Sequence, residues 1–205
     1  IQIDPKYYNY NLNRYQVKLG KYSFKRALFA KKFLYEDFNS LYSFAFSRNP
    51  VDRVLSMFYY LYFKDNFKGY IKRNMKSFKY CREISFGIKK EFDIFLNYIY
   101  HIHVENRIKY PNFFPLDYHF ATHTAPMFPD ISENENIILT KVFKLENINK
   151  ALSEVFESCN IKHNTKIIKH NERTKNSIFK PSASQHKKIE KIYEKDFDLY
   201  ESIKG

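Results

Sequence analysis

The sequence predicts an α/β fold with a central, mainly parallel sheet flanked by helices. Short apolar runs such as 41–46 (LYSFAF) and 137–145 (IILTKVFKL) are typical of buried strands. Each run is followed by a segment in which apolar residues recur at the spacing of a helix. Strands that alternate with helices are joined by crossover connections, which place successive strands parallel in one sheet.

The N-terminal part begins with an irregular arm over residues 1–14, followed by a short strand at 15–17. Residues 23–38 carry apolar side chains at helical spacing and predict the first helix. After the strand at 41–46, Pro50 suits the first position of a helix and Asp52 suits its first turn. A second helix is therefore expected from Pro50 onward.

Three more helices follow in the C-terminal part. One is predicted over 92–99, and another over 147–156, where Asn147 is a suitable N-cap. Ser182 and Gln185 form a capping-box pattern that opens the last helix. Its apolar stripe consists of Ile189, Tyr193, Phe197 and Tyr200. A loop or weak helix is expected over residues 64–82, a long structured loop over 109–130 and an irregular segment over 160–181.

Composition limits the class of protein. The 205 residues are 44% hydrophobic, which fits a single globular domain over 1–205 and excludes a disordered chain. The formal charge of +13 favours a polyanionic partner, such as a nucleotide, nucleic acid, sulfated glycan or membrane surface, although a solvated surface explains it equally well. Cys81 and Cys159 form no disulfide framework, and two reduced thiols are expected in preference to one bridge.

The strongest local signal is the segment 44–60 (FAFSRNPVDRVLSMFYY). An apolar strand delivers Arg48 to the carboxyl edge of the sheet, and Ser56 lies one turn after Asp52 in the helix that follows. A guanidinium, a hydroxyl and the free N–H groups of a helix start would together hold a dianion. The alternative is a structural Arg48–Asp52 pair at an ordinary strand–turn–helix.

This segment resembles the nucleotide-binding block of the carbohydrate-type (Golgi-like) sulfotransferases and their bacterial relatives. The block reads R-[ND]-P-x-[DE]-R-x-x-S-x-[YF]-[YF] after an apolar strand, and the chain matches it without a gap at Arg48, Asn49, Pro50, Asp52, Arg53, Ser56, Phe58 and Tyr59. Further resemblances follow in the same order as in the family, at 119–128, 141–156, 170–174 and 189–203. At 119–128 the family's H-[WF]-x-P-Q element has Thr122 in place of Pro and His123 in place of Gln.

The resemblance implies a P-loop NTPase-like sulfotransferase fold that uses 3′-phosphoadenosine 5′-phosphosulfate (PAPS) as co-substrate. Arg48 and Ser56 would bind the 3′-phosphate, whereas Arg53 would serve structure at the turn. The family's phosphate loop for the 5′-phosphosulfate, P-K-x-G-x-[TS]-[TS], is similar to 17–23 (VKLGKYS) at Lys18, Gly20 and Ser23. Lys18 would stabilise the leaving phosphate, although Val17 and Tyr22 depart from the pattern.

Sulfuryl transfer also needs a base that takes the proton of the acceptor hydroxyl. His119 is the first candidate, because histidine titrates near neutral pH and this position matches the family element. His123 and Glu36 are alternatives. No metal is expected, since the reaction needs none. The expected function is therefore sulfation of a carbohydrate hydroxyl with release of the desulfated nucleotide PAP.

Two other functions remain open at this stage. A nucleic-acid-binding module would use the +13 charge and the aromatic residues among the lysines of 64–82, although no nucleic-acid motif is present and no such partner is expected. A degenerate sulfotransferase would bind ligand without turnover. The bacterial cytoplasm is the favoured location, with a Golgi luminal domain, and a membrane anchor upstream of Ile1, as the alternative. The acceptor and the oligomeric state are not identified by the sequence.

Overall fold

The computed structural model describes residues 27–31, 35–60, 88–105, 123–162 and 180–204. The predicted strand at 15–17 and the predicted loop at 64–82 lie outside these residues, as does most of 160–181. The described residues fall into two compact units. The strand unit draws on 1–48, 127–174 and 198–205, and the helical unit draws on 49–126 and 175–197.

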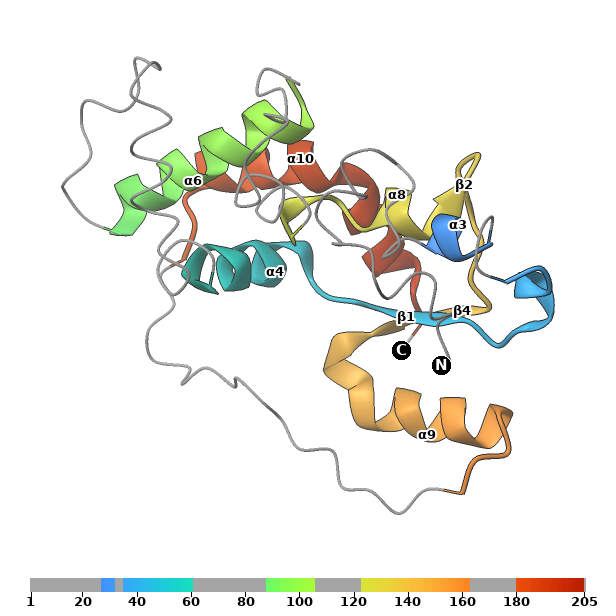
Figure 1. The fold of residues 1–205 in the computed structure, drawn as a ribbon. Coiled ribbons are helices and arrows are strands. Elements are labelled where there is room, and N and C mark those ends of the chain that lie inside the picture. Colours follow the sequence, from blue (N-terminus) through green and yellow to red (C-terminus); the bar gives the residue numbers. More distant parts are fainter. Residues whose placement is uncertain (1–26, 32–34, 61–87, 106–122, 163–179, 205) are drawn as a thin grey trace. The chain divides into compact units, whose positions relative to one another are not determined.

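The strand unit contains the predicted parallel pairing. Strand β1 (Phe44–Ser47) pairs in parallel with β4 (Lys141–Lys144), in a register that places Ser47 opposite Lys144 (Figure 1). Helix α9 (Ile148–Ser158) follows β4 and packs against it. A small core joins the two layers and consists of Phe143, Ala151 and Val155, with Tyr42 and Phe46 at its margin. The α/β prediction is thus confirmed, with a parallel sheet of two strands in the described part of the chain.

The predicted strand over 137–145 is divided in the structure. Strands β2 (Ser132–Glu133) and β3 (Asn136–Ile137) form an antiparallel hairpin before β4 begins. Its two turn residues, Asn134 and Glu135, have φ angles of 49° and 65°. Left-handed backbone at both positions matches the twist of a two-residue hairpin turn, so the chain reverses here. The apolar run alone does not reveal this break.

The helix predicted over 23–38 does not extend to residue 38 in the structure. Helix α3 covers Ala27–Phe29, and the amide of Tyr35 donates to the carbonyl of Ala30 at 3.1 Å, a wider turn than that of an α-helix. The chain then leaves the helix and forms the 3₁₀ turn η3 (Phe38–Ser40), which buries Phe38. The predicted loop over 109–130 also changes at its end, where the one-turn helix α8 (Phe128–Ile131) begins.

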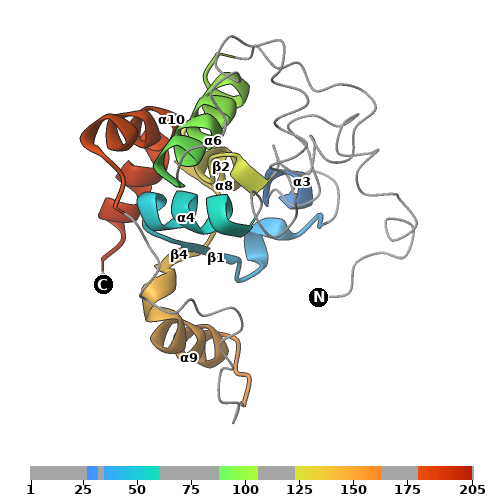
Figure 2. The same cartoon turned by 90° about the vertical axis from the view of Figure 1, so that its left-hand side faces the viewer.

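The helical unit is built from α4 (Pro50–Met57), α6 (Ile88–His103) and α10 (Ala183–Ser202) as far as Phe197. Figure 2 shows these three helices gathered around one core. Helix α6 is longer than the predicted 92–99 at both ends. The buried side chains are Val54, Leu55, Phe58, Phe92, Ile94, Phe95, Leu96, Tyr98, Ile99, Ile102, Ile189, Ile192 and Tyr193.

The start of α10 confirms the predicted capping box. The amide of Ser182 donates to Gln185 Oε1 at 2.8 Å, and the amide of Gln185 donates to Ser182 Oγ at 3.3 Å. Gln185 Nε2 also donates to Asp93 Oδ1 at 2.8 Å, which joins α10 to α6. Asn147 precedes α9 as expected, but its side chain makes no capping hydrogen bond. Among the described helices, none has both the length and the apolar content needed to cross a bilayer.

Candidate functional site

The carboxyl ends of the two parallel strands carry two cationic residues. Arg48 directly follows the buried Ser47 at the end of β1, and Ser47 is in register with Lys144 at the end of β4. The half-buried Arg48 makes no ion pair within the described part of the strand unit. Parallel sheets bind anionic ligands at this edge. The sequence analysis missed Lys144, although its place at the end of the next predicted strand was a usable signal.

The start of α4 differs from the prediction in one chemical respect. Asn49 Oδ1 accepts hydrogen bonds from the amides of Val51 at 3.0 Å and Asp52 at 3.3 Å. Pro50 has no N–H group, and the amide of Arg53 donates to the carbonyl of Asn49 at 2.9 Å. The first-turn amides therefore already have acceptors, and the expectation that they are free is wrong.

The two residues expected at the 3′-phosphate belong to different units. Arg48 is the last residue of its segment in the strand unit, and Ser56 lies in α4 within the helical unit. Ser56 is half-buried. The structure therefore describes the surroundings of Arg48 and Ser56 separately. That both bind one phosphate stays a prediction.

The other predicted site residues fall mostly outside the described part of the chain. Lys18, Gly20 and Ser23 of the expected phosphate loop lie there, as does His119, the first candidate for the base. Of the two alternatives, His123 is half-buried at the start of the segment that leads to α8, and Glu36 is exposed just before η3.

Arg53 is committed to the interior of the helical unit. Its Nη1 donates to Asp196 Oδ2 at 3.0 Å, and its Nη2 donates to the carbonyl of Ala125 at 2.6 Å. Its guanidinium also lies 5.5 Å from the centroid of the Tyr193 ring. The Asp196 side chain is only 5% exposed, so this ion pair is largely shielded from solvent. The prediction that Arg53 serves structure is confirmed.

Two further side chains hold the backbone beside Ala125. The Tyr193 hydroxyl donates to the carbonyl of Thr124 at 2.7 Å, and His103 Nε2 lies 2.9 Å from Thr124 Oγ1. Burial raises the pKa of Tyr193, so its hydroxyl keeps the proton that it donates. Burial, and then the charge of Arg53, lowers the pKa of His103 to about 4, so this imidazole is neutral at physiological pH.

Together, Arg53, His103 and Tyr193 fix the segment that immediately follows His123. We call these three side chains, with Asp196, the Arg53 network. The sequence analysis did not find it as a unit, because its members lie on three elements. One signal was available, since Tyr193 and Asp196 are two of the positions at which the last helix resembles the family pattern.

Comparison with known proteins decides the family. A model of the sulfotransferase family matches residues 9–201, nearly the whole chain. The chain belongs to the sulfotransferase family. No curated protein and no solved structure matches it. The match confirms the family suspected from the Arg48–Tyr59 block and includes the segment that contains Lys18.

Family membership gives the described geometry a chemical meaning. A sulfotransferase carries a negatively charged sulfuryl group between two molecules, and it therefore needs fixed cationic donors. In the strand unit, Arg48 and Lys144 lie at the edge where α/β folds bind anions. In the part of the chain that the structure describes, no three His, Cys, Asp or Glu side chains gather as a metal site.

Proposed function

We propose that this sulfotransferase moves a sulfuryl group from PAPS to a hydroxyl of a carbohydrate acceptor and releases PAP. The observation that carries the proposal is the cationic carboxyl edge of the β1–β4 pair, where Arg48 has no ion pair in the described part of its unit. A guanidinium that no protein carboxylate occupies is suited to a phosphate ligand, because its planar fork donates two parallel hydrogen bonds.

Side chains fit the donor nucleotide better than the backbone does. Asn49 accepts hydrogen bonds from the amides at the start of α4, so we assign the phosphate to two side chains, the Arg48 guanidinium and the Ser56 hydroxyl. Lys144 adds a second positive charge at the same strand edge as Arg48. Its ammonium lies 4.8 Å from the centroid of the Tyr200 ring, a cation–π contact that orients it.

The chemical step is an in-line attack of the acceptor hydroxyl on sulfur. Charge builds on the phosphate oxygen that departs, and the chain's contribution is positioning and charge stabilisation. In this proposal, the segment 17–23 forms a P-loop-like turn, in which Gly20 lets the backbone approach and Ser23 donates its hydroxyl. Lys18 neutralises the departing phosphate. His119 takes the proton of the acceptor hydroxyl, with His123 and Glu36 as the alternatives.

The Arg53 network supports this chemistry indirectly. It joins α4, which carries Ser56, to the backbone of Thr124 and Ala125, which follows one of the candidate bases. Arg53, Tyr193 and Asp196 are therefore positioning residues. Their loss would disturb two parts of the proposed active site without removing a group that touches substrate.

Transfer of ³⁵S from labelled PAPS to an oligosaccharide tests the proposal. We expect the wild-type chain to label a hyaluronan or a chitin hexasaccharide, and Arg48→Ala to abolish the labelling. Arg48→Lys should retain a small part of the activity, because it keeps the charge but loses the fork. PAP binding without any transfer would indicate a degenerate enzyme. The proposal would be refuted if the wild-type chain showed no PAP binding and no transfer.

A further inference from the structure

The Arg53 network holds one short stretch of backbone, at Thr124 and Ala125, from three helices. The carbonyl of Thr124 accepts a hydrogen bond from the Tyr193 hydroxyl of α10 at 2.7 Å, and the carbonyl of Ala125 accepts one from Arg53 Nη2 of α4 at 2.6 Å. The Thr124 side chain is fully buried, and its Oγ1 lies 2.9 Å from His103 Nε2 of α6. All of these groups belong to the helical unit.

The contact between His103 and Thr124 does more than fill space. An apolar pair of the same shape would be about as stable in a buried position, because a hydrogen bond inside the protein only replaces hydrogen bonds to water. The polar pair adds a fixed direction, which holds the Thr124 side chain in one orientation. Burial and the charge of Arg53 lower the pKa of His103 to about 4, so its imidazole stays neutral at physiological pH. His103 is therefore suited to hold Thr124 and not to act as the base.

His123 directly precedes this anchored stretch. It is half-buried and shares a helical conformation with Thr124. Of the other described histidines, His101 and His103 are on α6 with partners of their own, and His186 lies near the start of α10. Among the described histidines, His123 is thus the one that adjoins the network and is partly open to solvent. A base has to be held within about 0.5 Å of its productive position, which an anchored backbone favours.

The network also connects this stretch to the helix that carries a proposed phosphate ligand. Arg53 lies three positions before Ser56 on α4, so the two side chains are neighbours on the helix surface. The same Arg53 bonds the carbonyl of Ala125. The backbone after His123 and the hydroxyl of Ser56 therefore have a common support within one unit.

We infer that Thr124 and His103 are positioning residues of the proposed reaction, and that the base they position is His123. The inference rests on the proposed function and decides between the candidate bases named there. The His123 imidazole takes the proton of the acceptor hydroxyl while the hydroxyl oxygen bonds to sulfur. The bond from sulfur to the phosphate oxygen breaks, and PAP leaves with its electron pair. The imidazolium then loses its proton to solvent.

The pH dependence of ³⁵S transfer from PAPS to the hyaluronan and chitin hexasaccharides tests the base, with the full chain throughout. In the wild type, kcat should fall at acid pH as the base becomes protonated. His123→Gln should lose this acid limb and about 100-fold in kcat, with PAP affinity within about twofold of the wild type. His119→Gln should keep the acid limb. The control His186→Gln should keep both the limb and the wild-type kcat.

A matched pair of variants at Thr124 tests the positioning. Thr124→Val keeps the shape but removes the hydroxyl, so kcat should fall about tenfold while KM for PAPS stays within about twofold. Thr124→Ser keeps the hydroxyl and should recover most of the rate. Tyr193→Phe should act like Thr124→Val, because it removes the donor to the Thr124 carbonyl.

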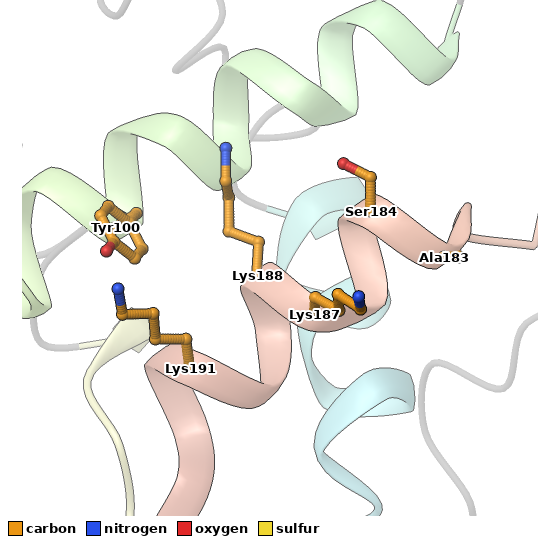
Figure 3. A pocket seen from close by; sticks show the side chains of 6 residues that line it. All are labelled: Tyr100, Ala183, Ser184, Lys187, Lys188 and Lys191. Atoms are coloured by element: carbon orange, nitrogen blue, oxygen red, sulfur yellow. The ribbon is translucent and has the colours of Figure 1, made fainter.

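Tyr100→Phe is the control for Tyr193→Phe. The Tyr100 hydroxyl bonds Lys191 instead, and Figure 3 shows Lys191 ending beside the Tyr100 ring in a hollow between α6 and α10. Removing this hydroxyl should leave kcat unchanged. Urea denaturation checks that each variant is folded. If Thr124→Val is not, the comparison of Tyr193→Phe with Tyr100→Phe decides the positioning role.

The outcomes separate this inference from the proposed function. A wild-type chain that neither binds PAP nor transfers sulfate would refute the proposed function, and the inference with it. Binding of PAP without transfer would overturn the inference, because a base implies turnover. Transfer by the wild type with an acid limb that persists in His123→Gln would overturn the inference alone. Equal kcat values for Thr124→Val and Thr124→Ser would overturn the positioning role.

Discussion

Two arginines of one short segment have different surroundings in the two units. Arg53, in the helical unit, is held by Asp196, by the carbonyl of Ala125 and by the Tyr193 ring. Arg48, in the strand unit, has no ion pair among the described residues of that unit and lies at the carboxyl edge of the sheet. A guanidinium that pairs with a buried carboxylate stabilises the fold. A guanidinium with no ion pair in its own unit can bind a ligand.

The hydrophobic core of the unit that contains Arg53 is also larger than the described core of the unit that contains Arg48. The helical unit has a large aromatic core, in which Phe58, Phe92 and Phe95 are fully buried and their ring centroids lie 5.0 to 6.2 Å apart. The described core of the strand unit consists of Phe143, Ala151 and Val155. We therefore expect substitutions near Arg53 to change stability and substitutions near Arg48 to change ligand affinity.

The largest expected effect is on the stability of Arg53→Met. This substitution removes the guanidinium that pairs with the buried Asp196 carboxylate, and we expect a loss of about 3 kcal/mol in the free energy of unfolding. Urea denaturation measures it. The matched variant Arg48→Met should change stability by less than about 0.5 kcal/mol. Adding Asp196→Leu to Arg53→Met should recover most of the loss. Equal losses in the two single variants would remove the distinction between the arginines.

A second effect, of up to about 3 kcal/mol, is expected from His103 as the pH falls. Its pKa is about 4 in the folded chain and about 6.5 when unfolded, so the unfolded chain takes up the proton first. The contribution to stability is complete above pH 6.5 and is lost as the pH falls toward about 4. Urea denaturation across this range should show a shallower decline for His103→Gln than for the wild-type chain. Identical slopes would contradict a buried, neutral His103.

A smaller effect is expected from Lys144→Gln on nucleotide affinity. Removing one partly solvated positive charge at the Arg48 edge should weaken PAP binding about threefold at low salt, and less at high salt because ions screen the interaction. Calorimetry measures both conditions. Lys150→Gln on α9 is the control, and it should leave PAP affinity unchanged. A loss that is equal in the control would place Lys144 outside the nucleotide site.

The fold was predictable where local chemistry decides it. Pro50 marked the start of α4, and Ser182 with Gln185 marked the start of α10, because caps depend only on nearby residues. The hairpin that precedes β4 was not predicted, because the apolar run over 137–145 includes only its last residue, Ile137. Its turn residues, Asn134 and Glu135, lie before that run.

The site was predictable where a motif carries it. Arg48 and Ser56 followed from one contiguous block, whereas His103, Tyr193 and the carbonyl of Ala125 are assembled from distant segments. The prediction of free amides at the start of α4 was wrong for a physical reason. The Asn49 side chain that caps the helix accepts hydrogen bonds from those amides. A capping residue is easily recognised in a sequence. Which amides it makes unavailable to a ligand is seen only in the structure.

The most direct test of the account is calorimetric titration of PAP into the wild-type chain and Arg48→Ala. Losing a bidentate, charged contact to phosphate should weaken binding about thirtyfold, which corresponds to about 2 kcal/mol. The urea midpoint should remain that of the wild type, so that the loss reports binding alone. If Arg48→Ala binds PAP as tightly as the wild-type chain does, Arg48 does not hold the nucleotide and the account is contradicted.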